Sequence, residues 1–192
     1  EGLLKVRLHG VEYDVMRQDA LGIPGVRQVA GSSVVPLGSR NDHWLAPVGG
    51  EVFKGYRYHV TEEFIEVLDL QLLAGRDLDP VRDESQSVII NEMAALRYGF
   101  ETPEEAVGQT VQRGSDAENL RQDTVIGVVR DFQANHIDMA DAAVVMARGD
   151  GLQFANILVT PGQEESTLTR LSEIWEGYGL MQPFEGETYA KH

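Results

Sequence analysis

The stretch SVIINEMAALRYGF, residues 87–100, constrains the fold more than any other part of this 192-residue chain. Its apolar run VII predicts a buried strand, which gives way at Asn91 to a helical segment that ends at Gly99. Asn91 can cap this helix through its side chain, and Glu92 is well placed in the first turn. A strand that passes into a helix without a loop predicts a mixed α and β structure, and the corner needs no chemistry to explain it.

The rest of the chain alternates between the two apolar periods. Helices are predicted at residues 11–21, with Val11, Val15 and Leu21 on the apolar face, at 62–75 and at 162–179, with a helical turn at 102–108. Strands are predicted at 26–30, 53–60, 124–132, 142–147, 154–160 and 183–189, whereas 36–51, 77–86 and 113–123 are predicted as irregular, hairpin or loop segments. The order of elements predicts an α+β fold with two interleaved units.

Composition narrows the range of partners. The net charge is -15, from 31 acidic and 16 basic residues, which disfavours nucleic acid and anionic lipid because both would be repelled. The chain has no cysteine, which excludes disulfides and thiolate sites. No apolar run approaches the roughly 18 residues of a membrane helix. The start at Glu1 without a signal sequence indicates a mature or excised fragment.

Candidate chemistry is sparse. The segment HIDMAD brings together His136, Asp138 and Asp141, but a metal site requires these three groups to converge, whereas a solvated loop requires nothing. The segment DLDPVRDES fails as a calcium loop because Arg82 stands where glycine is needed and Val88 where a glutamate is needed. The sequence has no glycine-rich phosphate loop and no nucleophile elbow. We therefore expect no catalytic, cofactor-binding or metal-binding residues.

Pairs of glutamates have a structural explanation as well. Each pair falls in a predicted first helical turn, where the helix dipole favours negative charge. The pairs are Glu62–Glu63, Glu104–Glu105 and Glu164–Glu165.

Five motifs in order point to a family. They are FIEVLDLQLLAGRDLD, SVIINEMAALRYGF, EEAVGQTV, TVIGVVRDFQANHI and, near the end, IWEGYGLMQPFEGETY. Over residues 60–190 they resemble the extracytoplasmic (periplasmic core) domain of MacB-like ABC transporter permeases of the FtsX family. Many relatives have a proline where this chain has Ala142 or Ala143. Segment 36–51 has no counterpart in the family pattern. The family-marked positions, expected to form corners and caps, are Gly75, Arg76, Asn91, Glu92, Gly108, Gly127, Asp131 and Phe132.

The resemblance implies a domain between the first and second transmembrane helices of an inner-membrane permease. Its fold would pair a discontinuous porter-like βαβ-type subdomain, residues 1–70 and 150–192, with an inserted mixed α/β subdomain, residues 71–149. The implied function is to transmit ATP-driven motion in an efflux or lipoprotein-release system, without catalysis and without a cofactor. The implied partners are a cytoplasmic ABC ATPase acting through the full-length permease, a second permease subunit in a homodimer or heterodimer, and a periplasmic adaptor or lipoprotein.

Two other readings remain open at the level of sequence. One is a free-standing secreted or periplasmic ligand-binding module with the same α+β build. The other is a hydrolase that uses the HIDMAD carboxylates and His136.

Overall fold

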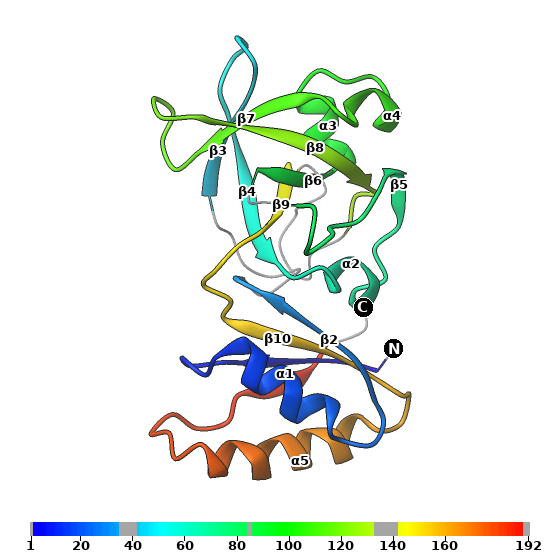
Figure 1. The fold of residues 1–192 in the computed structure, drawn as a ribbon, viewed down its shortest axis with the longest axis vertical. Coiled ribbons are helices and arrows are strands. Elements are labelled where there is room, and N and C mark those ends of the chain that lie inside the picture. Colours follow the sequence, from blue (N-terminus) through cyan, green and yellow to red (C-terminus); the bar gives the residue numbers. More distant parts are fainter. Residues whose placement is uncertain (1, 35–41, 84–85, 133–141, 190–192) are drawn as a thin grey trace.

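The computed structural model describes residues 2–34, 42–83, 86–132 and 142–189, which form two lobes along the long axis (Figure 1). The helices are α1 (Tyr13–Leu21), α2 (Phe64–Val67), α3 (Glu92–Arg97), α4 (Pro103–Ala106) and α5 (Glu164–Gly177). The strands are β1 (Leu3–Arg7), β2 (Val26–Ser32), β3 (Asp42–Pro47), β4 (Phe53–Val60), β5 (Leu72–Gly75), β6 (Ser87–Asn91), β7 (Thr110–Gly114), β8 (Arg121–Val129), β9 (Val144–Arg148), β10 (Phe154–Val159) and β11 (Gly186–Thr188). No helix in these ranges is both long enough and apolar enough to span a bilayer.

The first lobe, here called the terminal lobe, is built from both ends of the chain. Its antiparallel sheet has the order β11-β1-β10-β2, and α1 and α5 pack on it (Figure 1). Met16 of α1 and Leu171 and Trp175 of α5 are buried against Val6 and Ile157 of the sheet. The apolar stripes of the two helices therefore meet a single sheet face, which gives this lobe its own core.

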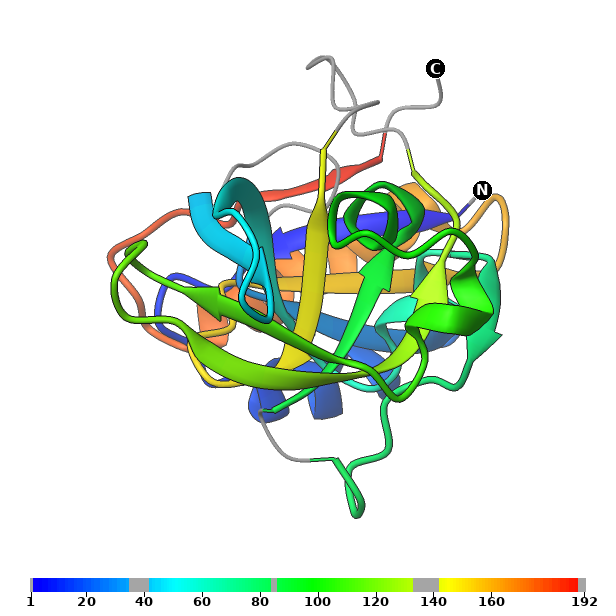
Figure 2. The same ribbon diagram turned by 90° about the horizontal axis from the view of Figure 1, so that it is seen from above.

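The second lobe, here called the barrel lobe, is a closed ring of strands with α3 and α4 packed on it. Pairing runs from β4 to β3, β7, β8, β6 and β9 and returns to β4 (Figure 2). The β6–β8 and β4–β9 pairs are parallel and the others are antiparallel. Val111, Val125 and Val145 from three of the strands are buried in one cluster with Tyr98 at the end of α3. Alternate residues of the strands thus fill the ring with side chains.

A third apolar cluster, here called the seam, joins the two lobes. It combines Ala30 of β2 with Tyr58 of β4, Phe64 of α2 and Met146 of β9. All four are buried, and Leu158 of β10 packs against them from the terminal lobe. The lobes consequently share a core at the point where they meet.

The α+β class and the two interleaved subdomains are confirmed. The predicted division at residues 70 and 150 stays a prediction. In the structure β3 and β4 pair with β7 and β9, so residues 42–60 lie in the barrel lobe.

The predicted helix over residues 62–75 is wrong. The helix α2 ends at Val67, and Asp69 then adopts a positive φ of 53°, which interrupts helical geometry. The chain continues as β5, which pairs antiparallel with β8. Leu68, Leu70 and Leu72 alternate with polar residues, and this strand-like period prevails over the helical one.

The predicted loop over residues 113–123 is confirmed for 115–120 but is wrong at both ends, because β7 extends to Gly114 and β8 begins at Arg121. Arg113 and Asp123 face each other in the barrel lobe, and Arg113 Nε donates to Asp123 Oδ2. Their exposed fractions are 0% and 2%. Charged residues such as these led to the prediction of an exposed loop. Their ion pair allows both side chains to be buried.

Two differences concern the start of the chain. Strand β1 was not predicted, although its burial alternates along LLKVR. The first helix is confirmed, but its buried residues are Met16 and Ala20, whereas Val15 and Leu21 are 46% and 37% exposed. Of the three predicted residues, only Val11 packs against the core of the terminal lobe, so the predicted apolar face is wrong for Val15 and Leu21.

Candidate functional site: a cleft between the two lobes

Three of the family-marked residues meet where β5 leaves β8. Gly75 has a φ of +77°, and a Cβ there would collide with the carbonyl oxygen of Ile126. A Cβ on Gly127 would meet the carbonyl oxygen of Arg76, so the two strands approach too closely for side chains at either glycine. The Arg76 Nη2 atom donates to Asp83 Oδ1 at 2.7 Å, and this guanidinium lowers the pKa of Asp83 to about 2.

A second group lies at the corner between β6 and α3. The Asn91 side chain accepts from the backbone N–H of Ala94 at 3.1 Å and so caps α3, which confirms the predicted cap. Its Nδ2 atom donates to Asp131 Oδ1 at 2.7 Å, and Glu92 Oε2 accepts from the N–H of Asp131 at 2.9 Å. These contacts tie the end of β8 to the start of α3.

The two remaining marked positions also have structural contacts. Gly108 has a φ of +83°, and its N–H donates to the carbonyl of Val125 at 2.7 Å. Phe132 packs against the seam. The role of the marked residues in corners and caps stays a prediction, which their hydrogen bonds and packing support.

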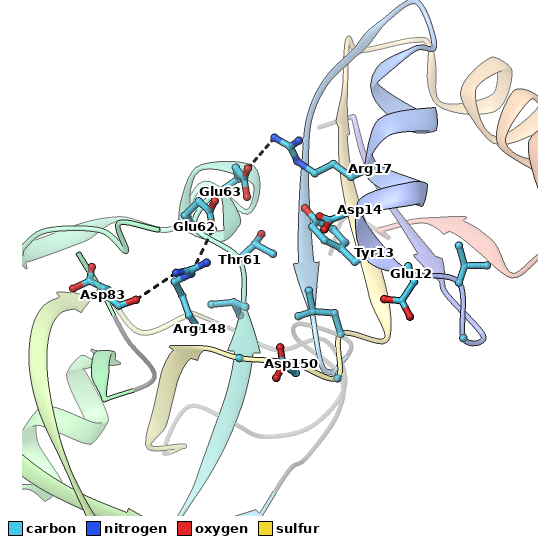
Figure 3. A pocket seen from close by; sticks show the side chains of 16 residues that line it. Glu12, Tyr13, Asp14, Arg17, Thr61, Glu62, Glu63, Asp83, Arg148 and Asp150 are labelled. Carbon is cyan, nitrogen blue, oxygen red and sulfur yellow. Dashed lines mark hydrogen bonds and ion pairs between the residues drawn. The ribbon is translucent and has the colours of Figure 1, made fainter. Parts of the chain in front are cut away.

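A cleft of about 910 Å³ lies between the two lobes (Figure 3). One wall is the segment 10–17, which leads into α1 of the terminal lobe, and the other is the segment 60–63 between β4 and α2. The connection from β9 to β10, residues 148–152, crosses the cleft between these walls. Three segments far apart in sequence therefore converge on one concavity.

Two arginines of the cleft are engaged by its glutamates. Arg17 Nη2 on α1 donates to Glu63 Oε1 at 3.1 Å, which links the two walls (Figure 3). Arg148 Nε lies 3.7 Å from Glu62 Oε2, and its Nη1 donates to the carbonyl of Asp83 at 3.3 Å. Each of these arginines is therefore paired with a carboxylate of the segment 60–63.

The wall of the cleft formed by the segment 10–17 carries negative charge. Glu12 and Asp14 are exposed, and neither forms an ion pair with any described residue. Tyr13 between them donates its hydroxyl to the carbonyl of Val29 at 3.1 Å, and burial raises its pKa to about 12. The cleft is thus lined by carboxylates and a protonated phenol. These groups are suited to binding positively charged groups and hydrogen-bond donors.

The sequence did not predict this cleft. Glu62 and Glu63 were explained by a helix dipole, but their partners Arg17 and Arg148 lie in other elements and no local pattern links them. The glutamates at 104–105 and 164–165 do lie in first turns, and Glu105 completes a capping box with Thr102. The residues His136, Asp138 and Asp141 lie outside the described residues. Within the described ranges, no group of three or more His, Asp and Glu side chains is arranged to hold a metal ion.

Comparison with known proteins gives a consistent result. Residues 7–173 match the family model described as the MacB-like periplasmic core domain. Comparison with curated protein sequences gave no significant match.

Solved structures share the whole fold. The periplasmic region of MacB from Actinobacillus actinomycetemcomitans is 16% identical and matches with a TM-score of 0.69, covering 97% of this chain and 88% of that one. The extracellular domain of the noncanonic ABC-type transporter YknZ from Gram-positive bacteria is 13% identical, with a TM-score of 0.69 and coverage of 97% and 100%. A domain of a putative permease protein from Porphyromonas gingivalis is 16% identical, with a TM-score of 0.64 and coverage of 98% and 89%.

Proposed function

This chain belongs to the MacB-like periplasmic core domain family, a domain of ABC-type transporter permeases, and we propose that it transmits ATP-driven motion to substrates or partner proteins outside the cytoplasm. The observation that carries the proposal is the family match over residues 7–173. The proposed system is an exporter or a lipoprotein-release complex. A cytoplasmic ATPase, separate or fused, would supply the energy, and a second permease subunit would complete the complex.

The arrangement of the lobes supports a mechanical role. The start of β1 and the end of β11 lie on one side of the molecule, whereas α1 and the loop after β5 lie on the opposite side (Figure 2). If the chain ends lead to membrane helices, the α1 wall of the cleft faces away from the membrane. A partner protein would then meet the cleft first.

The test compares the transport phenotype of three forms of the full-length permease. These are the wild type, a form whose ATPase cannot hydrolyse ATP, and a form in which residues 2–189 are replaced by a Gly/Ser linker. The readouts are macrolide sensitivity, peptide sensitivity and release of lipoproteins. We expect the linker form to match the ATPase-deficient form in every readout that the latter changes. Wild-type behaviour of the linker form, or a gene that encodes a secreted protein without membrane helices, would overturn the proposal.

The contact surface has a test of its own. Replacing Glu12 and Asp14 together by lysine reverses the charge of the α1 wall without breaking an ion pair among the described residues. We expect transport to weaken in the same readouts, because the charge of the surface that contacts the partner has changed sign. The control replaces the exposed Glu173 and Glu176 of α5 by lysine. Equal effects of the two double variants would remove the cleft from the proposal.

A further inference from the structure

Strand β2 of the terminal lobe and strand β4 of the barrel lobe meet at a point that is here called the crossing. They pair through Ser32 and Val60. On one side of this pair the N–H of Thr61 donates to the carbonyl of Gly31 at 3.1 Å, and the Thr61 hydroxyl accepts from the N–H of Gly31 at 3.0 Å. Backbone and hydroxyl therefore form a reciprocal pair, which keeps both polar groups of Gly31 satisfied.

The other side of the crossing repeats the arrangement with the roles exchanged. The N–H of Ser33 donates to the carbonyl of His59 at 2.9 Å, and the Ser33 hydroxyl accepts from the N–H of His59 at 3.0 Å. Asn156 of β10 donates to the hydroxyl of Ser32 at 3.0 Å from the buried side. Reciprocal hydrogen bonds therefore flank the Ser32–Val60 pair on both sides, and these two pairs of bonds are here called the clamp.

Apolar packing backs the clamp. Phe64 and Val67 of α2 are 1% and 2% exposed, and they pack in the seam with residues of both lobes. Rotating the lobes against each other would expose part of this cluster to water, which is unfavourable in proportion to the apolar area exposed. Packed cores of this kind resist gradual deformation.

Further contacts bridge the cleft. The ion pair between Arg17 and Glu63 joins the two walls at 3.1 Å. Elsewhere in the cleft, His59 Nδ1 of β4 lies 2.8 Å from the carbonyl oxygen of Asp150 in the connection to the terminal lobe. A hinge between the lobes would have to break these contacts.

We propose that the two lobes form one rigid lever, so that the cleft keeps its width while the permease passes through its ATP cycle. This inference rests on the proposed function and adds how the motion is carried: the whole domain moves, and no part of the movement is absorbed between its lobes. A partner bound in the cleft would move together with the domain, and the two lobes would not close on it.

Spin labels measure this directly, because residues 1–192 contain no cysteine that would compete with an introduced labelling site; any cysteine elsewhere in the permease is replaced by serine first. One pair of labels, at Glu118→Cys in the barrel lobe and Glu173→Cys in the terminal lobe, reports the distance between the lobes; both positions are exposed. The full-length permease is labelled and diluted with unlabelled copies, so that each complex contains at most one labelled subunit. A second preparation with Glu173→Cys alone in every copy reports movement between subunits.

The distances are measured by double electron–electron resonance without nucleotide and with ATP trapped by a hydrolysis-deficient ATPase. We expect one narrow distance between the lobes in both states, together with a shifted distance between subunits. A shift between the lobes on ATP binding overturns the rigid lever. If the distance between subunits is the same with and without ATP, the result counts against the proposed function and not against the rigid lever. In that case a broad or double-peaked distance distribution between the lobes still overturns the rigid lever.

The clamp is tested by Thr61→Val, which removes the hydroxyl at nearly constant size. We expect a broader distance between the lobes and at least tenfold faster hydrogen exchange at the Gly31 amide, since its acceptor is lost. The matched control is Thr169→Val, whose hydroxyl donates within α5 to the carbonyl of Glu165. An unchanged distance distribution and unchanged exchange in Thr61→Val would show that the crossing does not hold the lobes.

Discussion

Replacement of Asn91 by alanine tests how much one polar side chain contributes to the corner between β6 and α3. Asn91 is 4% exposed and all of its hydrogen-bonding capacity is used. Its Oδ1 accepts from the N–H groups of Ala94 and Val144, at 3.1 and 2.8 Å. Its Nδ2 donates to Asp131 and to the carbonyl of Ala142, at 2.7 and 2.8 Å.

The expected loss follows from these partners. Losing the cap of α3 costs about 1 kcal/mol of the free energy of unfolding. The buried N–H of Val144 is left without an acceptor, which costs about 1–3 kcal/mol more, and the partly buried carbonyl of Ala142 adds up to about 1 kcal/mol. We expect Asn91→Ala to destabilise the domain by about 2–5 kcal/mol, or to lower Tm by about 4–20 °C in a chain of this size.

Urea denaturation followed by circular dichroism gives the free energy, and calorimetry gives Tm. Asn91→Ser separates the terms, because serine can still cap Ala94 but is too short to hold the partners on β9 and β8; it should recover about 1 kcal/mol. The control is Asn119→Ala, an exposed asparagine bound to Asp116, with a loss under about 0.5 kcal/mol. A loss below about 1 kcal/mol in Asn91→Ala would refute the argument that the corner depends on this side chain.

Three further changes test other parts of the structure. Asp123→Ala removes the carboxylate that the buried Arg113 binds and should cost about 3–5 kcal/mol in urea denaturation; Arg121→Ala, whose side chain is 48% exposed, should cost under about 1 kcal/mol, and similar losses would contradict the assignment. Because the Asp83 pKa is lowered to about 2, its stabilisation is complete above the unfolded pKa of about 4 and is lost as the pH falls toward 2. The unfolding free energy of the wild type should therefore fall by about 1–2 kcal/mol more than that of Asp83→Asn between pH 5 and 2, and parallel pH profiles would exclude this role. Gly75→Ala should cost more than Gly99→Ala, since both have positive φ but only the Gly75 Cβ would collide with backbone; equal Tm values would refute the close approach of β5 and β8.

The sequence predicted those elements whose signal is local. The capped corner at Asn91 and the helix with Leu171 and Trp175 on its buried face are both confirmed. Strand β4 has the predicted bounds, because FKGYRYHV alternates clearly and turn-forming residues precede it. In each case the residues that decide the structure lie within about ten positions of one another.

Elements that depend on distant partners were missed. The helix predicted over 62–75 stops at Val67 because β8 offers a pairing edge to Leu72–Gly75, which no local pattern reveals. Arg113 and Asp123 can be buried because β7 and β8 pair and bring their side chains within hydrogen-bonding distance. The cleft depends on the same kind of long-range contact: Arg17 and Glu63 are separated by 46 positions.

The closed ring of β3, β4 and β6–β9 has a consequence for crowding. Each of these strands has a neighbour on both sides along the ring, so the ring offers no row of open backbone groups to a strand from another molecule. The sheet of the terminal lobe has two ends, β11, a strand of three residues, and β2, which pairs with β4 only at Ser32 and also contacts α2. An edge as short as β11 is a poor template for strand addition, and β2 lies on the side of the barrel lobe (Figure 1). The closed ring and the short β11 edge therefore both limit aggregation through strand addition when many copies stand close together.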